Sequence, residues 1–246
     1  MKQVDFVDLG KSPYQETWDL QAAIQQRLID EKLAVRKGAS FEKRSHDVLL
    51  FVEHPHVYTL GKNGDLSHLL KSEDELTGIN AEFVKTNRGG DITYHGPGQI
   101  VGYPIMDLDR YFTDIHKYMR SLEEIMIRVC ADYGIEAGRI KGLTGTWVGN
   151  SKICAMGVKC SRWVTMHGFA LNVKTSLNYF NNIVPCGIAD KGVTSLEQLL
   201  GREIPVSEVK EKLIKHFEEV FDVEVKPAKT LPEFEQDFAY FKDRVI

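Results

Sequence analysis

The stretch from Arg88 to Gln99 constrains the fold of this chain more than any other. Four glycines and one proline fall within its twelve residues, around an Arg, an Asp, a Tyr, a His and a Gln. Glycine allows positive φ angles and a close approach of the backbone to a ligand, so this composition predicts two turns with Ile92–Tyr94 as a short strand between them. Two interpretations stay open: a substrate-binding wall, or a tight β-hairpin whose glycines serve only its turns.

The rest of the chain changes repeatedly between helical and β patterns. A continuous apolar run at Val48–Val52 is typical of a buried central strand. The clearest helix runs from Asp114 to Tyr133, where apolar residues recur at spacings of three and four. Further strands are expected near 1–8, 57–60, 81–86 and 100–105, and short β runs at 140–173. Further helices are expected at 13–36 (with Leu20, Ala23, Ile24 and Leu28 inward), after a Thr194–Glu197 capping box, at 206–221 and in part from 231.

Strands and helices mix in this pattern without strict alternation. We therefore expect an α/β (α+β) fold, with a mixed central β-sheet flanked by helices. No linker, low-complexity tract or internal repeat divides the chain, so a single domain over 1–246 is expected.

Bulk composition excludes several classes of protein. The 246 residues are 43% apolar and 27% charged with a net charge of −4, which are ordinary values for a globular protein. No apolar run is long enough to span a membrane, and the N-terminus alternates like a strand, unlike a signal peptide. The four cysteines form no CxxC pair, which favours free thiols in a reducing compartment. We expect a cytoplasmic protein without nucleic-acid or membrane partners.

Two short segments carry candidate catalytic residues. If Ser151–Val158 is a strand, Lys152 and Cys154 point to the same face, and a Lys on an apolar strand costs desolvation unless it has a partner or a role. Cys186 stands between a proline and a glycine, in a bend with little side-chain cover, where a nearby ammonium would favour the thiolate. Lys152 and Cys186 form a candidate activator–nucleophile pair, with Cys154 as a rival nucleophile. A surface Lys and a small buried Cys remain the alternative.

Metal and nucleotide motifs are weak in this sequence. His54 and His56 could ligate a metal from one strand face, but Pro55 between them favours a turn. No cluster of His, Cys and carboxylates has zinc-like spacing, so no metal is expected. Neither a P-loop nor a dinucleotide-binding glycine motif occurs.

Charge is unevenly distributed along the chain. No Asp or Glu lies between Ala137 and Ala189, a span that carries six Lys and Arg residues. Such a segment could steer an acidic partner, or it could be a part of the sheet too buried to carry many charges of either sign.

Four blocks of the sequence together resemble the lipoyl(octanoyl) transferase family. They are Arg-Gly-Gly-x-x-Thr-Tyr-His-Gly-Pro-Gly-Gln from Arg88, Lys-Ile-Cys-Ala-Met-Gly from Lys152, His-Gly-Phe-Ala-Leu-Asn-Val from His167, and Pro-Cys-Gly around Cys186. They stand in the family's order with similar spacing, over about Glu53–Glu197. The resemblance implies the fold of biotin and lipoate protein ligases. We expect a motif-bearing core at about 46–200 and a C-terminal helical extension at about 206–246.

The resemblance also implies roles for individual residues. Cys186 corresponds to the acyl-thioester nucleophile of the family, and Lys152 to the lysine that lowers its pKa. The substrate-binding positions correspond to three segments: Arg88, Gly89, Gly90, Asp91, Ile92, Thr93, Tyr94 and His95; Ala155, Met156 and Gly157; and Gly168, Phe169 and Ala170. Of these, Tyr94, Met156 and Phe169 are candidate walls for an acyl chain.

The implied reaction is ping-pong acyl transfer. Octanoyl–acyl carrier protein would deliver an octanoyl (or lipoyl) group to Cys186, and a lysine of a lipoyl domain would then take it as an amide. The acceptors would be lipoyl domains of 2-oxoacid dehydrogenase complexes and the glycine cleavage H protein. No ATP, metal or other cofactor is implied, and a monomer is expected. Two alternatives stay open: an ATP-dependent lipoate or biotin protein ligase on the same fold, and a non-catalytic module that binds acyl groups.

Overall fold

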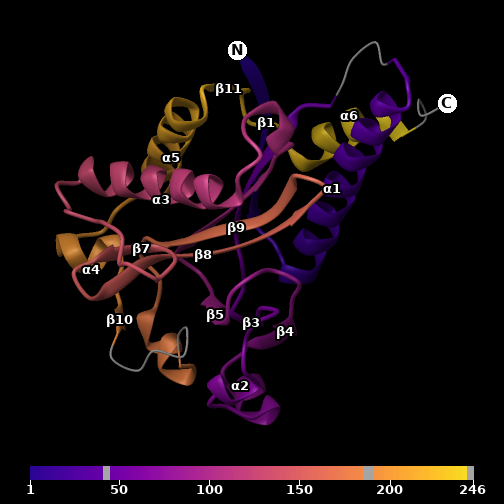
Figure 1. Ribbon diagram of the computed structural model, residues 1–246. Coiled ribbons are helices and arrows are strands. Elements are labelled where there is room, and N and C mark those ends of the chain that lie inside the picture. Colours follow the sequence, from indigo (N-terminus) through magenta and orange to yellow (C-terminus); the bar gives the residue numbers. More distant parts are fainter. Residues whose placement is uncertain (41–44, 185–190, 243–246) are drawn as a thin grey trace.

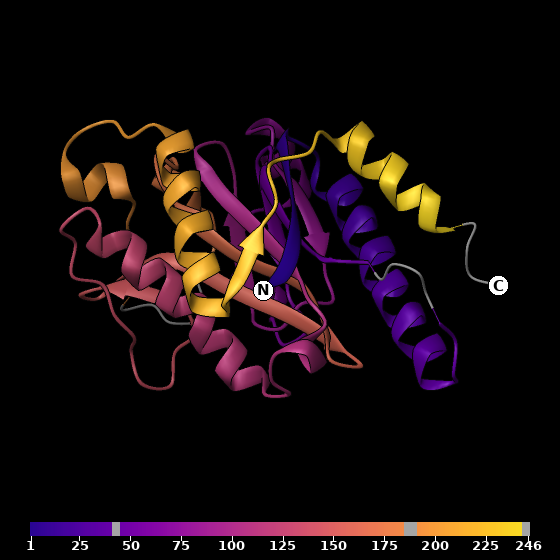
Figure 2. The ribbon, with the colours of Figure 1, turned by 90° about the horizontal axis from the view of Figure 1, so that it is seen from above.

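The computed structural model describes residues 1–40, 45–184 and 191–242, from 237 onward as backbone only. A mixed sheet of eight strands runs through these residues in the order β10–β8–β9–β6–β2–β1–β11, with β7 beside β8. Helices α3 and α5 cover one face of this sheet, and α1 and α6 lie on the other side (Figure 1, and from above in Figure 2). The mixed sheet flanked by helices is the fold that the sequence predicts.

A smaller sheet with the order β4–β3–β5 lies next to the larger one, together with helix α2, in the lower part of Figure 1. The strands are β1 Lys2–Lys11, β2 Asp47–Glu53, β3 Val57–Leu60, β4 Glu82–Lys85, β5 Ile92–His95, β6 Gln99–Ile105, β7 Thr146–Val148, β8 Ser151–Ser161, β9 Val164–Asn172, β10 Gly192–Val193 and β11 Val223–Val225. The α-helices are α1 Tyr14–Arg36, α2 Glu73–Gly78, α3 Ile115–Ala131, α4 Leu196–Leu200, α5 Val206–Phe221 and α6 Leu231–Lys242.

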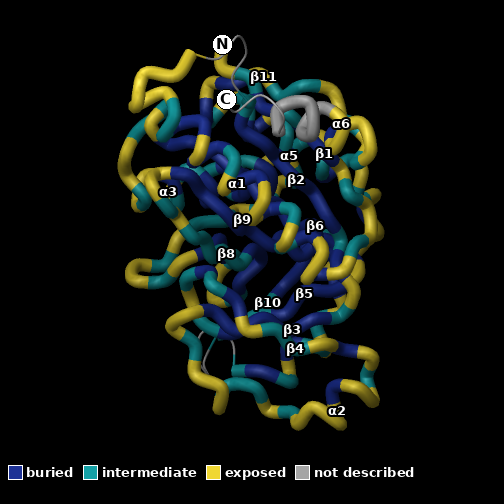
Figure 3. The backbone as a smooth tube through the Cα atoms, turned by 90° about the vertical axis from the view of Figure 1, so that its right-hand side faces the viewer, coloured by how far each residue is buried: buried dark blue, intermediate teal, exposed yellow. Residues whose placement is uncertain are grey.

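The core lies on both faces of the larger sheet. Leu49 and Phe51 of β2 pack on the face toward α3 and α5, while Val48, Leu50 and Val52 pack on the face toward α1. Strand β2 is therefore buried on both faces, as its continuous apolar run predicts. Figure 3 shows this buried centre, in dark blue, and the more exposed region around α2.

The amphipathic helices α3 and α5 form where the apolar periodicity predicts them. The side chain of Asp114 caps α3 by accepting hydrogen bonds from the backbone N–H groups of His116 and Lys117. The buried stripe of α3 then packs with that of α5 in one core cluster that also contains Cys130. Within the described residues, no helix has the length and apolar character needed to cross a bilayer.

Helix α1 has a more polar buried face than the sequence predicts. Ala23 is exposed, whereas Gln21 and Gln25 are buried. The side-chain amide of Gln25 donates to the backbone carbonyl of Val164 at 2.9 Å. The side-chain Oε1 of Gln21 accepts from the backbone N–H of His167 at 3.0 Å. These amides satisfy backbone groups of β9, so the buried face of α1 includes Gln21 and Gln25 and excludes the predicted Ala23.

The short β runs expected at 140–173 include one long hairpin, β8–β9. Its turn places Arg162 and Trp163 at φ angles of +50° and +65°. Two such residues make the type I′ geometry that matches the twist of a hairpin, but neither is the Gly or Asn that normally indicates it. The hairpin was therefore not apparent from the sequence.

Two short helices also differ from the expectation. Helix α2 lies in the segment 61–80, for which no helix is expected, and has a capping box between Ser72 and Glu75. Helix α4 is capped by Ser195, one residue later than the predicted Thr194.

Candidate active site

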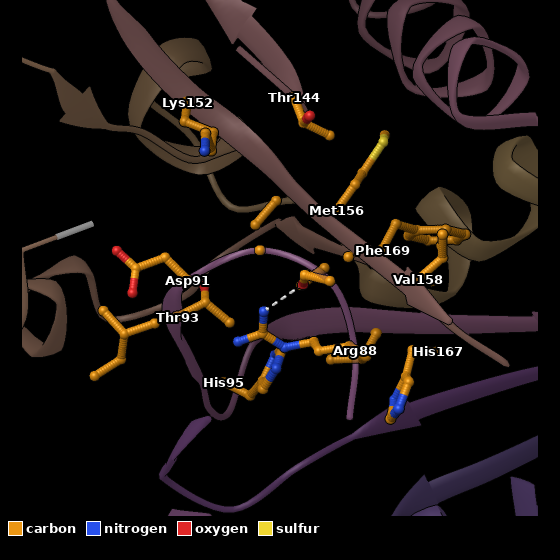
Figure 4. Close-up of a pocket in the computed structure, with 18 of the residues that line it drawn as sticks. Arg88, Asp91, Thr93, His95, Thr144, Lys152, Met156, Val158, His167 and Phe169 are labelled. Carbon is orange, nitrogen blue, oxygen red and sulfur yellow. Dashed lines mark hydrogen bonds between the residues drawn. The ribbon is translucent and has the colours of Figure 1, made fainter. Parts of the chain in front are cut away.

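A cavity of about 660 Å³ lies between the larger sheet and the segment that leads into β5 (Figure 4). It is lined by Arg88–Thr93 and His95 on one side and by residues of β8 and β9 on the other. The long glycine-rich stretch and the two later segments are thus brought together around one space. Its lining contains every predicted substrate-binding residue except Tyr94.

Small residues of β8 and β9 form the floor of the cavity. Ala155 pairs with Ala170, and Gly157 pairs with Gly168, across the antiparallel ladder. The Gly89 N–H donates to the carbonyl of Val158 at 2.9 Å, which holds the glycine-rich loop against this floor. A Cβ at Gly157 would lie 2.7 Å from the carbonyl oxygen of Gly89, so only glycine fits at that point.

Of the three predicted acyl walls, Met156 and Phe169 line the cavity and Tyr94 does not. Tyr94 packs in a separate aromatic cluster with Tyr58 and Tyr179, outside the cavity. Phe169 belongs to the core on the α3 side, where its ring meets Phe51. Met156 packs against that same core and points away from Arg88 in Figure 4. Side chains alternate along β8 and β9, so the larger Met156 and Phe169 next to Ala155 and Ala170 line the cavity and also pack against this core.

Arg88 ties the glycine-rich loop to β3. Its buried guanidinium donates to the hydroxyl of Thr59 at 2.9 Å and to the carbonyl of the same residue, and also to the carbonyl of Gly89 at 3.0 Å. Nearby, Asp91 accepts a 2.6 Å hydrogen bond from His68, which also lines the cavity. These hydrogen bonds fix the conformation of the glycine-rich loop beside the cavity floor.

His95 is a neutral, fixed imidazole. Its Nδ1 lies 2.9 Å from Oε1 of Gln99, an oxygen that can only accept, so Nδ1 carries the proton. Burial, followed by the charge of the neighbouring His54, places the pKa of His95 well below its ordinary value. His95 therefore acts as a hydrogen-bonding group rather than a cation at neutral pH.

Lys152 lies in β8 between two other strands. Trp147 of β7 pairs with it on one side, and Val193 of β10 pairs with it on the other. Its ammonium lies 4.7 Å from the centroid of the Trp147 ring, and its side chain lines the cavity. The sequence identified Lys152, but it carried no pattern that pointed to Trp147.

The expectation that Lys152 and Cys154 share a face is wrong. Consecutive residues Thr146 and Trp147 pair with Cys154 and Lys152, so Ile153 forms a β-bulge that breaks the alternation. Ile153 and Cys154 consequently both lie in the core, and burial raises the pKa of the Cys154 thiol well above its ordinary value. A thiol so placed does not serve as a nucleophile, which removes Cys154 as the rival.

Cys186 lies outside the described residues. The chain on either side of it does reach the cavity. The N–H of Val184 donates to the carbonyl of the cavity-lining His68 at 2.8 Å. Lys191 lines the cavity and leads into β10 beside Lys152.

His54 and His56 bind neighbouring protein groups. His54 contacts the carbonyl of Ser12 and the hydroxyl of Tyr103, each at 2.8 Å, and His56 contacts the hydroxyl of Tyr94 at 2.7 Å. In the described part of the chain, no three His, Cys, Asp or Glu side chains are arranged to hold a metal ion.

The segment without acidic residues is not uniformly cationic at the surface. Carboxylates from neighbouring elements pair with two of its cations: Glu123 and Glu124 with Arg139, and Glu203 with Lys174. Lys159 is different. Burial lowers the pKa of its ammonium, and the nearby charge of Lys62 lowers that pKa further. Within 1–40, 45–184 and 191–242, neither Lys62 nor Lys159 forms an ion pair with a carboxylate.

Comparisons with known proteins point to one family. The family model of the lipoyl protein ligase A/B catalytic domain matches residues 13–218. The octanoyltransferase of Christiangramia forsetii is 58% identical over 231 residues, which cover 92% of this chain and 98% of that protein. The octanoyltransferase of Flavobacterium johnsoniae is 56% identical over 230 residues, covering 91% and 99%. A solved lipoate-protein ligase A bound with ATP superposes with a TM-score of 0.70 at 17% identity, covering 98% and 93%, which shows the shared fold.

Proposed function

Because the chain belongs to the lipoyl protein ligase A/B catalytic domain family and is an octanoyltransferase of protein lipoylation, we propose that it transfers the octanoyl group through a thioester on Cys186. The observation that carries the proposal is the position of Lys152. It lines the cavity, and β10, which pairs with it, follows Cys186 by only a few residues. An ammonium at this place favours the thiolate of an approaching cysteine.

The proposed first half-reaction loads the enzyme. The Cys186 thiolate attacks the carbonyl carbon of the octanoyl thioester, and the carbonyl electron pair moves to oxygen. When that pair returns, the bond to the phosphopantetheine sulfur breaks, and the departing thiolate takes a proton from the Lys152 ammonium. One thioester replaces another, so the step needs neither ATP nor a metal.

The proposed second half-reaction transfers the octanoyl group from Cys186 to the acceptor lysine. The neutral amine of a lipoyl-domain lysine attacks the octanoyl–Cys186 thioester and gives one proton to the now neutral Lys152. The carbon–sulfur bond breaks, an amide forms, and the Cys186 thiolate and Lys152 ammonium are restored. Lys152 thus acts as an acid and then as a base in one cycle.

The cavity floor suits an apolar acyl chain. Ala155, Gly157, Gly168 and Ala170 leave room above the sheet that larger side chains would fill. We propose octanoyl–acyl carrier protein as the donor, lipoyl domains of 2-oxoacid dehydrogenase complexes and the glycine cleavage H protein as acceptors, no cofactor, and a cytoplasmic monomer with a single catalytic domain.

Intact-protein mass spectrometry tests the thioester directly. The protein is incubated with octanoyl–acyl carrier protein in the absence of ATP, and the expected result is a gain of one octanoyl group. Cys186→Ala should abolish the gain. Cys160→Ala is the matched control, because Cys160 is an exposed thiol outside the cavity lining. This variant should still gain one octanoyl group. Modification that strictly requires ATP would instead support a ligase.

A further inference from the structure

The indole N–H of Trp147 is a buried donor that has no acceptor in the described part of the chain. Trp147 is only 3% exposed, and its Nε1 forms no hydrogen bond with any residue that the structure describes. The indole nitrogen can donate but cannot accept, so another donor cannot satisfy it. Buried donors are nearly always paired in folded proteins, and an unpaired one costs about 1–3 kcal/mol. An unpaired donor on a cavity wall points to an acceptor on the ligand.

Trp147 lies in the cavity wall directly beside Lys152, the residue proposed to hold the thiolate. It lines the cavity and pairs with Lys152 across the β7–β8 ladder. The face of its ring lies toward the Lys152 ammonium, 4.7 Å from the centroid. The N–H lies in the plane of the ring, so it does not compete with the ammonium for the ring face. A carbonyl carbon within reach of a thiolate held by Lys152 is therefore also near the edge of the Trp147 ring.

We propose that the Trp147 indole N–H donates a hydrogen bond to the acyl carbonyl oxygen and stabilises the oxyanion in both half-reactions. In each half-reaction the carbonyl electron pair moves onto this oxygen as the nucleophile adds, and it returns when the leaving group departs. A fixed donor in a water-poor site favours the charged form more than the starting carbonyl. This inference rests on the proposed Cys186 thioester and adds Trp147 to the catalytic residues.

The neighbouring Thr146 is a natural control. Its hydroxyl is also buried and also lacks a partner within 1–40, 45–184 and 191–242. However, Thr146 does not line the cavity, and it pairs with Cys154, which lies in the core. The two residues therefore share burial, strand and an unpaired polar atom, and differ in that only Trp147 lines the cavity. An effect that comes only from disturbing β7 would appear in both.

The test combines Trp147→Phe, replacement of Trp147 by β-(3-benzothienyl)alanine, and Thr146→Val. The benzothienyl ring keeps the size and shape of indole but has sulfur in place of N–H, so it tests the donor even if Trp147→Phe folds poorly. Single-turnover acylation by octanoyl–acyl carrier protein gives the rate. The infrared stretch of a [1-¹³C]octanoyl carbonyl on the enzyme reports the hydrogen bond itself.

Both Trp147 replacements should slow acylation on the order of 10²-fold with little change in KM, and should shift the carbonyl stretch to higher frequency. Thr146→Val should change neither readout. An unchanged stretch in both replacements would overturn the inference even if the rate falls, because Trp147 would then act only by positioning Lys152. A wild-type enzyme that never carries an octanoyl group would overturn the thioester proposal and this inference together.

Discussion

The carboxylate of Glu123, on α3, accepts a hydrogen bond from the backbone N–H of Gly145 at 3.1 Å. Glu123 is buried and also pairs with Arg120 at 2.6 Å and with Arg139 at 2.9 Å. Gly145 has a φ angle of +113°, and a Cβ there would lie 2.6 Å from the carbonyl oxygen of Cys154 and 3.5 Å from the side chain of Lys152. Glu123 therefore holds the loop before β7 tightly against β8.

We expect Glu123→Ala to destabilise the protein by about 2 kcal/mol, because the buried Gly145 N–H loses its acceptor. Glu123→Gln should cost less, since its amide oxygen can still accept that hydrogen bond. Glu124→Ala is the control: Glu124 pairs with Arg139 at the surface, and such pairs contribute at most about 1 kcal/mol. Denaturant unfolding gives the free energies. Equal losses for the Ala and Gln variants of Glu123 would contradict the role given to Gly145.

The elements predicted most accurately from the sequence are those governed by local periodicity. Helix α5 begins and ends at the predicted Val206 and Phe221, because its apolar stripe and its length are properties of one continuous segment. The β-bulge at Ile153 and the Arg162–Trp163 turn were missed because they depend on how two strands pair. Local sequence contains no record of such pairing.

The same distinction applies to the candidate site. Lys152 is conspicuous as a Lys in an apolar strand, and the glycine-rich loop is conspicuous by composition. Trp147 and Glu123 carry no local pattern, and they reach Lys152 only through the β7–β8 ladder and the packing of α3. Predicting them would have required the register of strands that the sequence alone does not specify.

Stability should fall as the pH drops below about 6.5, because several buried histidines must stay neutral. Burial lowers the pKa of His54 from 6.5 to about 4, and its Nε2 accepts from the hydroxyl of Tyr103. The unfolded chain takes up the proton near pH 6.5, but the folded protein does so only near pH 4. The contribution of His54 to the free energy of unfolding is thus complete above pH 6.5. It falls by about 3 kcal/mol between pH 6.5 and pH 4.

The free energy of unfolding should be measured from pH 7.5 to 4.5 for wild type, His54→Gln and His116→Gln. His54→Gln removes one titrating group, so its curve should be shallower than that of wild type. His116 is exposed, and its replacement should leave the slope unchanged. Parallel curves for wild type and His54→Gln would show that this histidine does not contribute to the pH dependence.

We expect Lys62 and Lys159 to meet the acidic carrier protein that is proposed as the donor. The backbone N–H of Lys62 donates to the carbonyl of Arg88, and Lys159 follows the cavity-lining Val158, so both lie at the rim. We expect Lys62→Glu with Lys159→Glu to lower kcat/KM for octanoyl–acyl carrier protein about 10-fold at low salt, and less at high salt. A small octanoyl-pantetheine donor should be unaffected.

Lys174→Glu with Lys215→Glu makes the same change of net charge away from the cavity lining and serves as the control. Lys174 already pairs with Glu203 at 3.3 Å, so its replacement should have a smaller effect on the carrier protein. Equal losses for the two double variants would mean that only net charge matters. No loss at low salt would exclude the Lys62–Lys159 rim as the docking face.

Gly157 lies at the point where the cavity floor meets the glycine-rich loop. A Cβ at this position would come 2.7 Å from the carbonyl oxygen of Gly89 and 3.2 Å from Cδ of Arg88. The nearer atom belongs to the backbone, and the Gly89 N–H is bonded to the carbonyl of Val158 at 2.9 Å, so the loop has to shift as a unit. We expect Gly157→Ala to destabilise the protein by about 1–3 kcal/mol, as overpacking does.

The activity of Gly157→Ala should fall in a way that depends on the donor. The added methyl and the displaced loop both change the space above Ala155 and Ala170, so KM for octanoyl donors should rise more than KM for butanoyl donors. Gly78→Ala is the matched control, because a Cβ at Gly78 meets nothing within 4 Å and the residue lies in α2, away from the cavity. Steady-state kinetics with both donors checks this. If KM rises equally for the two chain lengths, Gly157 shapes the loop but not the space for the acyl chain.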